Sequence, residues 1–312
     1  MRLPGLVAAA LLLWGPAAAP AGERPSPPAP VFAADLDMVN VTVTIRDAAG
    51  NLVGGLGPED FVVLEDGRPQ AIQLFGRAVD PGHNETLALD LGLLMDTSQS
   101  MLQELKLSQE AATRFLQAIP RARELITIFF DQDIRVSRYD SENQQGLFDR
   151  ITQAKGGGNT ALYDAIAVYL SRVAGGTGRK VLVVFTDGED STSALSMGEL
   201  IRLVRGSAVT IYPIAFAGNL SNGSPGALRS RGFLNELADI TGGLVFRPTG
   251  SRDLAGIYGR ILQELSGQYV LGFVSDNTRQ DGKYRKLKVQ VRRDGLRVRH
   301  REGYFRSAGP FD

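Results

Sequence analysis

Two patterns of hydrophobic and polar residues divide the chain. Near the N-terminus, every second residue is apolar: Val39, Val41, Val43 and Ile45 are separated by polar residues. The same period of two returns at residues 287–291. This period is typical of strands with one buried face. Unbroken apolar runs lie between these regions, at residues 91–95 and 181–185. Such runs are typical of strands buried on both faces of a parallel sheet.

Helical patterns follow the buried runs. Apolar residues recur at helical spacing in five segments: residues 105–119, 162–173, 200–204, 233–240 and 254–265. Ser196 and Glu199 form a capping-box signature before the third of these segments. The alternation predicts an α/β fold of the doubly wound, Rossmann-like kind. We expect a six-stranded, mostly parallel sheet, with residues 134–139 as an edge strand and residues 244–246 as the last strand.

Oxygen-bearing side chains gather where the buried runs end. Asp96, Ser98 and Ser100 follow the first run, and Asp187 follows the second. Thr160 comes directly after the glycine-rich residues 156–158, at the start of a helix. A carboxylate with two hydroxyls and no adjacent base is a poor catalytic set, but hard cations prefer such oxygens. Taken singly, the hydroxyls also suit helix caps, and Asp187 suits an ordinary turn.

The three elements D-x-S-x-S, G-N-T and T-D-G, in that order, resemble the metal-ion-dependent adhesion site of von Willebrand factor A domains, which include the integrin inserted domains. The resemblance covers residues 87–267. It implies that Asp96, Ser98, Ser100, Thr160 and Asp187 coordinate Mg²⁺ (or Mn²⁺ or Ca²⁺). It also implies an open position for an Asp or Glu of a protein partner.

The flanking β-patterns lack a core of their own. We therefore expect residues 36–80 and 268–306 to form one small β-sandwich into which the domain of residues 87–267 is inserted. These flanks resemble a group of secreted, acidobacterial-type proteins related to von Willebrand A domains. The resemblance is carried by Asp60-Phe61, Glu65-Asp66-Gly67, residues 269–272 and Gly303-Tyr304. That group implies no settled activity.

The N-terminus has the pattern of an export signal. Arg2 supplies a positive charge, residues 6–14 a short apolar core, and Ala19-Pro20-Ala21 a small-residue cleavage site. We expect residues 1–21 to be a signal peptide cleaved after Ala21, and the Pro-rich residues 22–35 to be a leader. The mature protein would be secreted or periplasmic, with no integral membrane span.

Composition and charge exclude several classes of function. The formal net charge is +0, which gives no basis for nucleic-acid binding. The absence of cysteine excludes disulfides and thiolate zinc sites, and the 2 histidines do not form a zinc-hydrolase motif. The C-terminal residues 283–306 are rich in Lys and Arg. Their alternation favours an outward strand face, with a patch for anionic polymers as the alternative.

Together these features predict a secreted, metal-dependent protein-binding or adhesion module that is not an enzyme. One alternative is a metal-dependent hydrolase with Glu189 as its base. Another is a structural envelope protein whose metal only stabilises the loops. The helix of residues 253–265 runs into the second half of the sandwich and could transmit a change from the metal site. The sequence leaves the oligomeric state open.

Overall fold

A computed structural model describes residues 38–78, 88–119, 122–139, 144–173, 178–216, 223–249 and 251–306. The predicted signal peptide and Pro-rich leader lie outside these ranges. Within them, no helix has both the length and the apolar character needed to cross a membrane.

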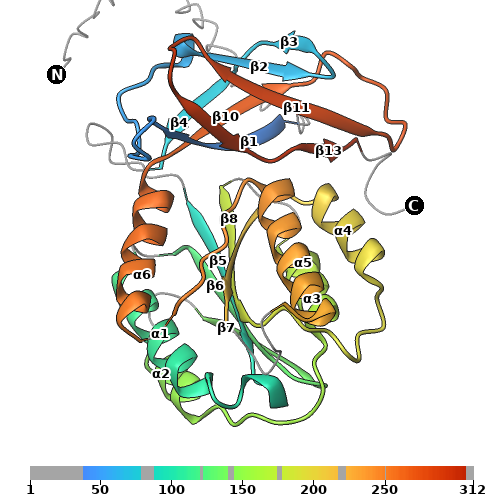
Figure 1. Cartoon of the computed structure of the whole chain (residues 1–312). Coiled ribbons are helices and arrows are strands. Elements are labelled where there is room, and N and C mark those ends of the chain that lie inside the picture. The colour runs from blue at the N-terminus through green and yellow to red at the C-terminus, as the bar shows by residue number, and fades with distance from the viewer. Residues whose placement is uncertain are drawn as a thin grey trace, which may run out of the picture. The chain divides into compact units, whose positions relative to one another are not determined.

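The central sheet has the strand order β7-β6-β5-β8-β9 (Figure 1). Its strands are β5 (Leu89–Asp96), β6 (Glu124–Phe130), β7 (Ile134–Tyr139), β8 (Arg179–Thr186) and β9 (Val209–Ala215). All neighbours are parallel except β6 and β7, which are antiparallel. The predicted mostly parallel sheet and its antiparallel edge strand are thus confirmed. The chain order reverses at β5, and ligands of open α/β sheets bind outside the carboxyl end of such a strand.

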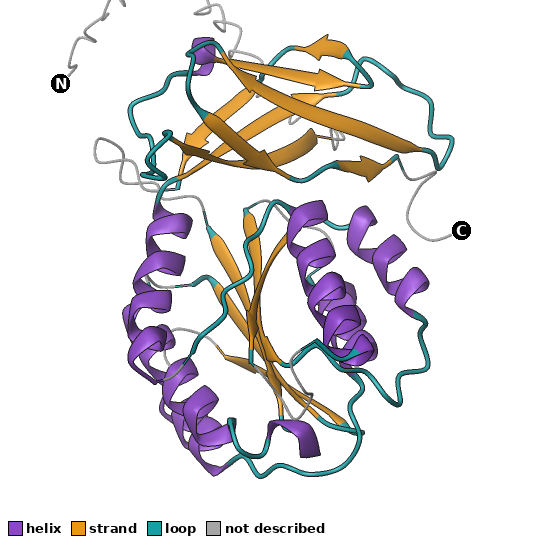
Figure 2. Cartoon of the chain, viewed as in Figure 1, coloured by secondary structure: helices purple, strands orange, loops and turns teal. Residues whose placement is uncertain are grey.

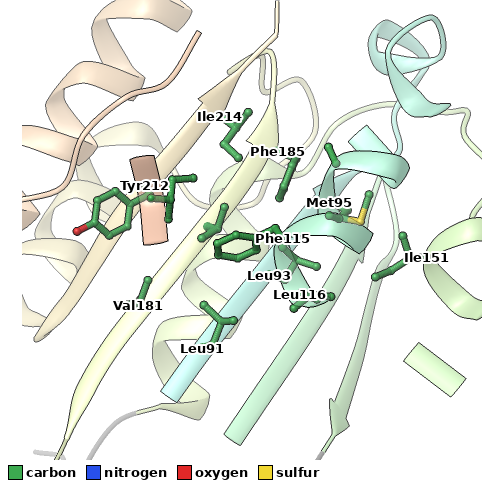
Figure 3. Packing of buried hydrophobic residues seen from close by; sticks show 14 of the residues in the cluster. Leu91, Leu93, Met95, Phe115, Leu116, Ile151, Val181, Phe185, Tyr212 and Ile214 are labelled. Carbon is green, nitrogen blue, oxygen red and sulfur yellow. The ribbon is translucent and has the colours of Figure 1, made fainter. Parts of the chain in front are cut away.

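Helices cover both faces of this sheet (Figures 1 and 2). Their bounds are α1 (Leu105–Ala118), α2 (Gln144–Gln153), α3 (Leu162–Arg172), α4 (Met197–Gly206), α5 (Pro225–Thr241) and α6 (Ser251–Ser266). Helices α1, α2 and α6 share one hydrophobic core with the sheet, and α3, α4 and α5 share the other. Figure 3 shows Leu91 and Leu93 of β5 packed near Phe115 of α1 in the first core. The predicted capping box of Ser196 and Glu199 begins α4.

Gly92 is the one turn-type residue in the apolar run of β5, and packing explains it. A Cβ added at Gly92 would lie 2.2 Å from Cε2 of Tyr169 and 2.7 Å from Cδ1 of Leu182. The Tyr169 ring is fully buried there, and its hydroxyl donates to the carbonyl oxygen of Val181 at 2.9 Å. Glycine therefore lets α3 approach the middle of the sheet.

The expected sixth strand is wrong. Phe246 makes an isolated parallel bridge with Ile214 of β9, and the described sheet has five strands. Phe246 N donates to the Pro213 carbonyl oxygen, and Ala215 N donates to that of Phe246, both at 2.8 Å. The apolar run is only three residues long and Pro248, which follows, has no N–H to extend a ladder.

The first and last strands of the described chain form two antiparallel sheets, of order β12-β1-β10-β4 and β13-β11-β2-β3. The N-terminal strands are β1 (Met38–Arg46), β2 (Phe61–Glu65), β3 (Arg68–Gln70) and β4 (Leu74–Arg77). The C-terminal strands are β10 (Gln268–Val274), β11 (Tyr284–Val291), β12 (Arg297–His300) and β13 (Gly303–Phe305). Val41, Leu271 and Val289 belong to one core shared by both sheets. The fold class with a sandwich of N- and C-terminal strands is confirmed.

Residues 297–305 form two strands rather than one continuous strand. β12 pairs with β1, whereas β13 pairs with β11 in the other sheet. Between them, Glu302 N donates to the carbonyl oxygen of Ile240 in α5 instead of a strand partner. This contact interrupts the strand and lets the chain change sheets.

An ion cluster joins α6 to the sandwich. Glu264 of α6 is fully buried and forms ion pairs with Arg46 of β1 and Arg299 of β12. The Glu264 carboxylate therefore pairs with two guanidinium groups that come from different strands of one sheet.

Candidate functional site

The five residues predicted to bind a cation belong to loops at the carboxyl ends of β5 and β8 and before α3. Asp96 is the last residue of β5, Asp187 follows Thr186 at the end of β8, and Thr160 lies two residues before Leu162, where α3 begins. In the parallel register, Met95 is opposite Phe185, so the two strands end side by side. These ends lie at the point where the strand order of the sheet reverses.

The first loop is built around Asp96. Its side chain is 0 % exposed, and Oδ1 accepts hydrogen bonds from Ser98 N at 2.9 Å and from Ser98 Oγ at 2.5 Å. The hydroxyls of Ser98 and Ser100 are 3.2 Å apart. The first three predicted oxygen ligands are therefore in one connected group.

The helix-cap interpretation of these hydroxyls is wrong for Ser98 and Thr160. Ser98 precedes a short 3₁₀ turn, Gln99–Met101, but its side chain makes no capping hydrogen bond and instead bonds Asp96. The N-cap of α3 is Ala161, so Thr160 is one residue too early. Local helix capping thus does not account for either hydroxyl.

The second loop brings Thr186 and Asp187 to the same place. Thr186 Oγ1 donates to Asp96 Oδ2 at 2.7 Å and accepts from Gly188 N at 3.0 Å. Asp187 Oδ1 accepts from Glu189 N at 3.0 Å. Asp187 Oδ2 is buried and has no hydrogen-bond partner. A buried carboxylate oxygen without a donor is costly, and a positive charge beside it would offset that cost.

The buried carboxylates of Asp96 and Asp187 interact unfavourably with each other. Burial raises the pKa of the Asp96 carboxyl to about 7; hydrogen bonds from Ser98 and Thr186 oppose the shift, and the charge of Asp187 adds to it. Burial, and then the charge of Asp187, also raise the pKa of Glu189. Among the described residues, no Lys or Arg forms an ion pair with Asp96 or Asp187.

The glycine loop is tied to the other two loops through the backbone. Gln99 N donates to the Gly158 carbonyl oxygen at 3.0 Å, and Gly157 N donates to that of Thr97 at 2.7 Å. Gly158 has a φ of +81°, a conformation that favours glycine. On the other side, the N–H groups of Ser191 and Thr192 donate to the Thr160 carbonyl oxygen at 2.9 and 3.1 Å. All three predicted loops are thus in direct contact.

Arg135 and Asp131, which are not among the predicted site residues, stabilise the first loop. Arg135 of β7 donates to Asp131 Oδ2 at 2.7 Å and to Thr97 Oγ1 at 3.0 Å. Asp131 also accepts, through its carbonyl oxygen, from Ala161 N next to Thr160 at 2.8 Å. The polar turn after β6 could have indicated these two residues from the sequence. β6 ends at the same edge of the sheet as β5 and β8.

The donor set fits a hard cation in composition. It offers two carboxylates and three hydroxyls, all oxygens, and one of the carboxylate oxygens is buried without a partner. Among the described residues, no cluster of three or more His, Cys, Asp or Glu side chains could hold a metal. A metal at this set would therefore depend on the hydroxyls of Ser98, Ser100 and Thr160.

The comparison with protein families identifies the central domain. Residues 90–260 match the von Willebrand factor type A domain, and the chain belongs to that family. The predicted family resemblance is thereby confirmed, while the acidobacterial-type subgroup stays a prediction. A comparison with curated proteins gives no significant match.

Several solved structures are similar to the chain. The conserved hypothetical protein BatB from Bacteroides thetaiotaomicron is 14% identical over 56% of this chain and 97% of that one, with a TM-score of 0.45. A von Willebrand factor type A protein from Catenulispora acidiphila is 13% identical over 86% of this chain and 73% of that one, with a TM-score of 0.48. The PilB minor pilin from Streptococcus sanguinis is 11% identical over 60% of this chain and 64% of that one, with a TM-score of 0.47.

Proposed function

We propose that this protein binds a partner protein through a divalent cation held by Asp96, Ser98, Ser100, Thr160 and Asp187. The observation that carries the proposal is the pair of buried carboxylates, Asp96 and Asp187, which repel each other and form no ion pair with a described Lys or Arg. Buried like charges of this kind are unfavourable unless a positive charge lies with them. Domains of this family are in general protein-interaction modules.

The charged and the neutral side chains of the set have different roles. Asp96 and Asp187 supply two negative charges, while Ser98, Ser100 and Thr160 add oxygen atoms without adding charge. A bound Mg²⁺, Mn²⁺ or Ca²⁺ would supply a positive centre that accepts a carboxylate from the partner. Because only two carboxylates of this chain belong to the set, attraction for an acidic group of the partner is retained.

The surrounding residues hold the set in place before any ligand arrives. Thr186 fixes the Oδ2 of Asp96, and Ser98 fixes its Oδ1 through two hydrogen bonds. The glycine loop is held to the Asp96 loop by two backbone hydrogen bonds. This preorganisation reduces the ordering cost of binding. The predicted signal peptide would deliver the protein to a secreted or periplasmic location, where acidic groups of other proteins are accessible.

Calorimetric titration of Mg²⁺ and Mn²⁺ tests the first half of the proposal. Asp187→Asn keeps the shape of the side chain but removes one of the two charges, so we expect cation binding to be lost. Asp239→Asn, on an exposed face of α5, is the matched control and should bind as the unchanged protein does. Equal binding by all three proteins would contradict the proposed ligands.

The proposed binding of a partner protein is tested by an affinity pull-down. The immobilised protein is incubated with the cell-surface fraction of the exporting cell. We expect the unchanged protein to retain one partner in Mg²⁺ and to release it in EDTA. Asp187→Asn should retain none in either buffer. If the titration shows cation binding but retention is the same in Mg²⁺ and EDTA, the cation has a structural role and the adhesion proposal is wrong.

A further inference from the structure

A cavity lies near the start of β8, at the opposite end of this strand from the candidate site. Its volume is about 300 Å³, and it is lined by residues around the starts of β1 and β8, the end of α4, Val270, Arg301 and residues 304–306. Lys180 lies at the start of β8, whereas Asp187 follows the end of the same strand. This cavity is therefore separate from the set of residues proposed to bind the cation.

The charged residues that line this cavity are all positive. They are Lys180, Arg301 and Arg306, and no Asp or Glu is among the lining residues. Clefts lined by one sign of charge concentrate ions of the other sign. The strand-face interpretation of the basic C-terminal region holds for Lys286 and Lys288, which are exposed, but Arg306 is buried.

Among the described residues, no Asp or Glu forms an ion pair with Arg301. Its NH1 donates to the Ser207 carbonyl oxygen at 3.2 Å, and its guanidinium carbon lies 5.5 Å from the centre of the Tyr304 ring. Its Nε is buried and makes no hydrogen bond. Burial lowers the pKa of Arg301 to about 10. The guanidinium is partly buried, and a bound anion would offset its positive charge.

Lys180 adds a second positive charge to the lining of this cavity. Its side chain is 9 % exposed, and the carboxylate acting on it is Asp90 of the neighbouring strand. Asp90 already accepts two hydrogen bonds from Arg123, at 2.9 and 2.5 Å. Burial lowers the pKa of Lys180. The charge of Asp90 raises this pKa, and the charge of Arg123 lowers it.

We propose that the cavity lined by Lys180, Arg301 and Arg306 binds a phosphate group, either as free phosphate or as the head of a small phosphoester. Guanidinium and ammonium groups together offer donors in several directions, which suits a tetrahedral oxyanion. Asn40 also lines the cavity, and its Oδ1 is buried without a partner. It can accept a hydrogen bond from a protonated phosphate or an ester hydroxyl. Met38, Val270 and Phe305 supply apolar lining for the carbon part of an ester.

Calorimetric titration with inorganic phosphate and with glycerol 3-phosphate tests this proposal. The titrations use the whole chain without divalent cations, so that the proposed cation site plays no part. We expect binding of one or both ligands. Tighter binding of glycerol 3-phosphate would identify a phosphoester, and equal binding would identify free phosphate. No binding of either ligand at tens of millimolar would overturn the proposal.

Variants locate the bound phosphate. Arg301→Gln and, as a second and milder change, Lys180→Gln should each weaken binding at least about tenfold, as expected for loss of a charge-assisted hydrogen bond. Arg293→Gln is the matched control, because Arg293 pairs with Asp60 and is not among the lining residues. Asp187→Asn should also bind phosphate normally. Unchanged affinity in a folded Arg301 or Lys180 variant would contradict the site.

Discussion

The hydroxyl of Thr186 donates a hydrogen bond to Asp96 Oδ2 over 2.7 Å and so connects the end of β8 to the end of β5. The same hydroxyl accepts from Gly188 N, which orients the turn that carries Asp187. One side chain thus positions both carboxylates of the candidate site. It lies directly before Asp187 but is not one of the five predicted ligands.

Thr186→Val removes this hydroxyl while keeping the shape of the side chain. Asp96 Oδ2 loses its donor inside the protein, so we expect a loss of about 1–3 kcal/mol in the free energy of unfolding, measured by urea denaturation. Affinity for Mg²⁺, measured by titration calorimetry, should fall as well. Thr152→Val, on an exposed position of α2, is the control. Unchanged Mg²⁺ affinity in the Thr186 variant would show that the hydroxyl does not position the carboxylates.

Gly92→Ala tests the packing of α3 on the sheet. The added methyl would overlap the ring of Tyr169, so the free energy of unfolding should fall by about 1–3 kcal/mol. Gly146→Ala in α2 is the matched control, since no atom lies within 4 Å of its added Cβ. That control should be neutral or stabilising by up to about 1 kcal/mol. Equal stability of the two variants would argue against close packing at Gly92.

Glu264→Gln tests the ion cluster that joins α6 to the sandwich. The substitution leaves Arg46 and Arg299 without their shared carboxylate, and breaking a buried pair in this way costs about 3–5 kcal/mol. Glu302→Gln breaks an exposed pair with Arg205 and should cost about 0–1 kcal/mol. Urea denaturation of both variants gives the comparison. A small effect at Glu264 would mean that the cluster contributes little to stability.

His300 gives the protein a predictable dependence on pH. Burial lowers its pKa from the ordinary value of 6.5, and its Nε2 accepts from Val289 N at 3.0 Å, which requires that nitrogen to be unprotonated. As the pH falls below 6.5 the unfolded chain takes up a proton that the folded chain does not. The free energy of unfolding therefore falls from about that pH down to the lowered pKa.

His300→Gln keeps an acceptor for Val289 N but does not titrate. Between about pH 7 and about pH 5, we expect the unchanged protein to lose more stability than this variant in urea denaturation. His83 and the carboxylates are common to both proteins, so their contributions cancel in the difference. Parallel losses in the two proteins would show that His300 titrates normally in the folded state.

The parts of the fold that could be predicted depend on local patterns. The apolar runs of β5 and β8 identify buried parallel strands, and the ends of parallel strands meet at one edge. This rule was enough to place Asp96 and Asp187 together. Alternating residues likewise identified β1 and β11, which lie in the two different sheets of the sandwich.

The parts that could not be predicted depend on contacts between distant segments. Arg135 and Thr97 are 38 positions apart, and nothing local indicates that one bonds the other. Glu264 has the sequence context of an exposed helix residue, yet it is buried by two arginines from the sandwich. The break between β12 and β13 depends on a bond to Ile240 in α5, which no strand pattern reveals.

Anomalous diffraction from crystals of the protein grown with Mn²⁺ tests the central claim most directly. The account predicts one strong Mn²⁺ peak within coordination distance of oxygens from the Asp96 loop, Thr160 and Asp187, and no such peak in Asp187→Asn. A Mn²⁺ peak elsewhere, or none at these three loops, would contradict it.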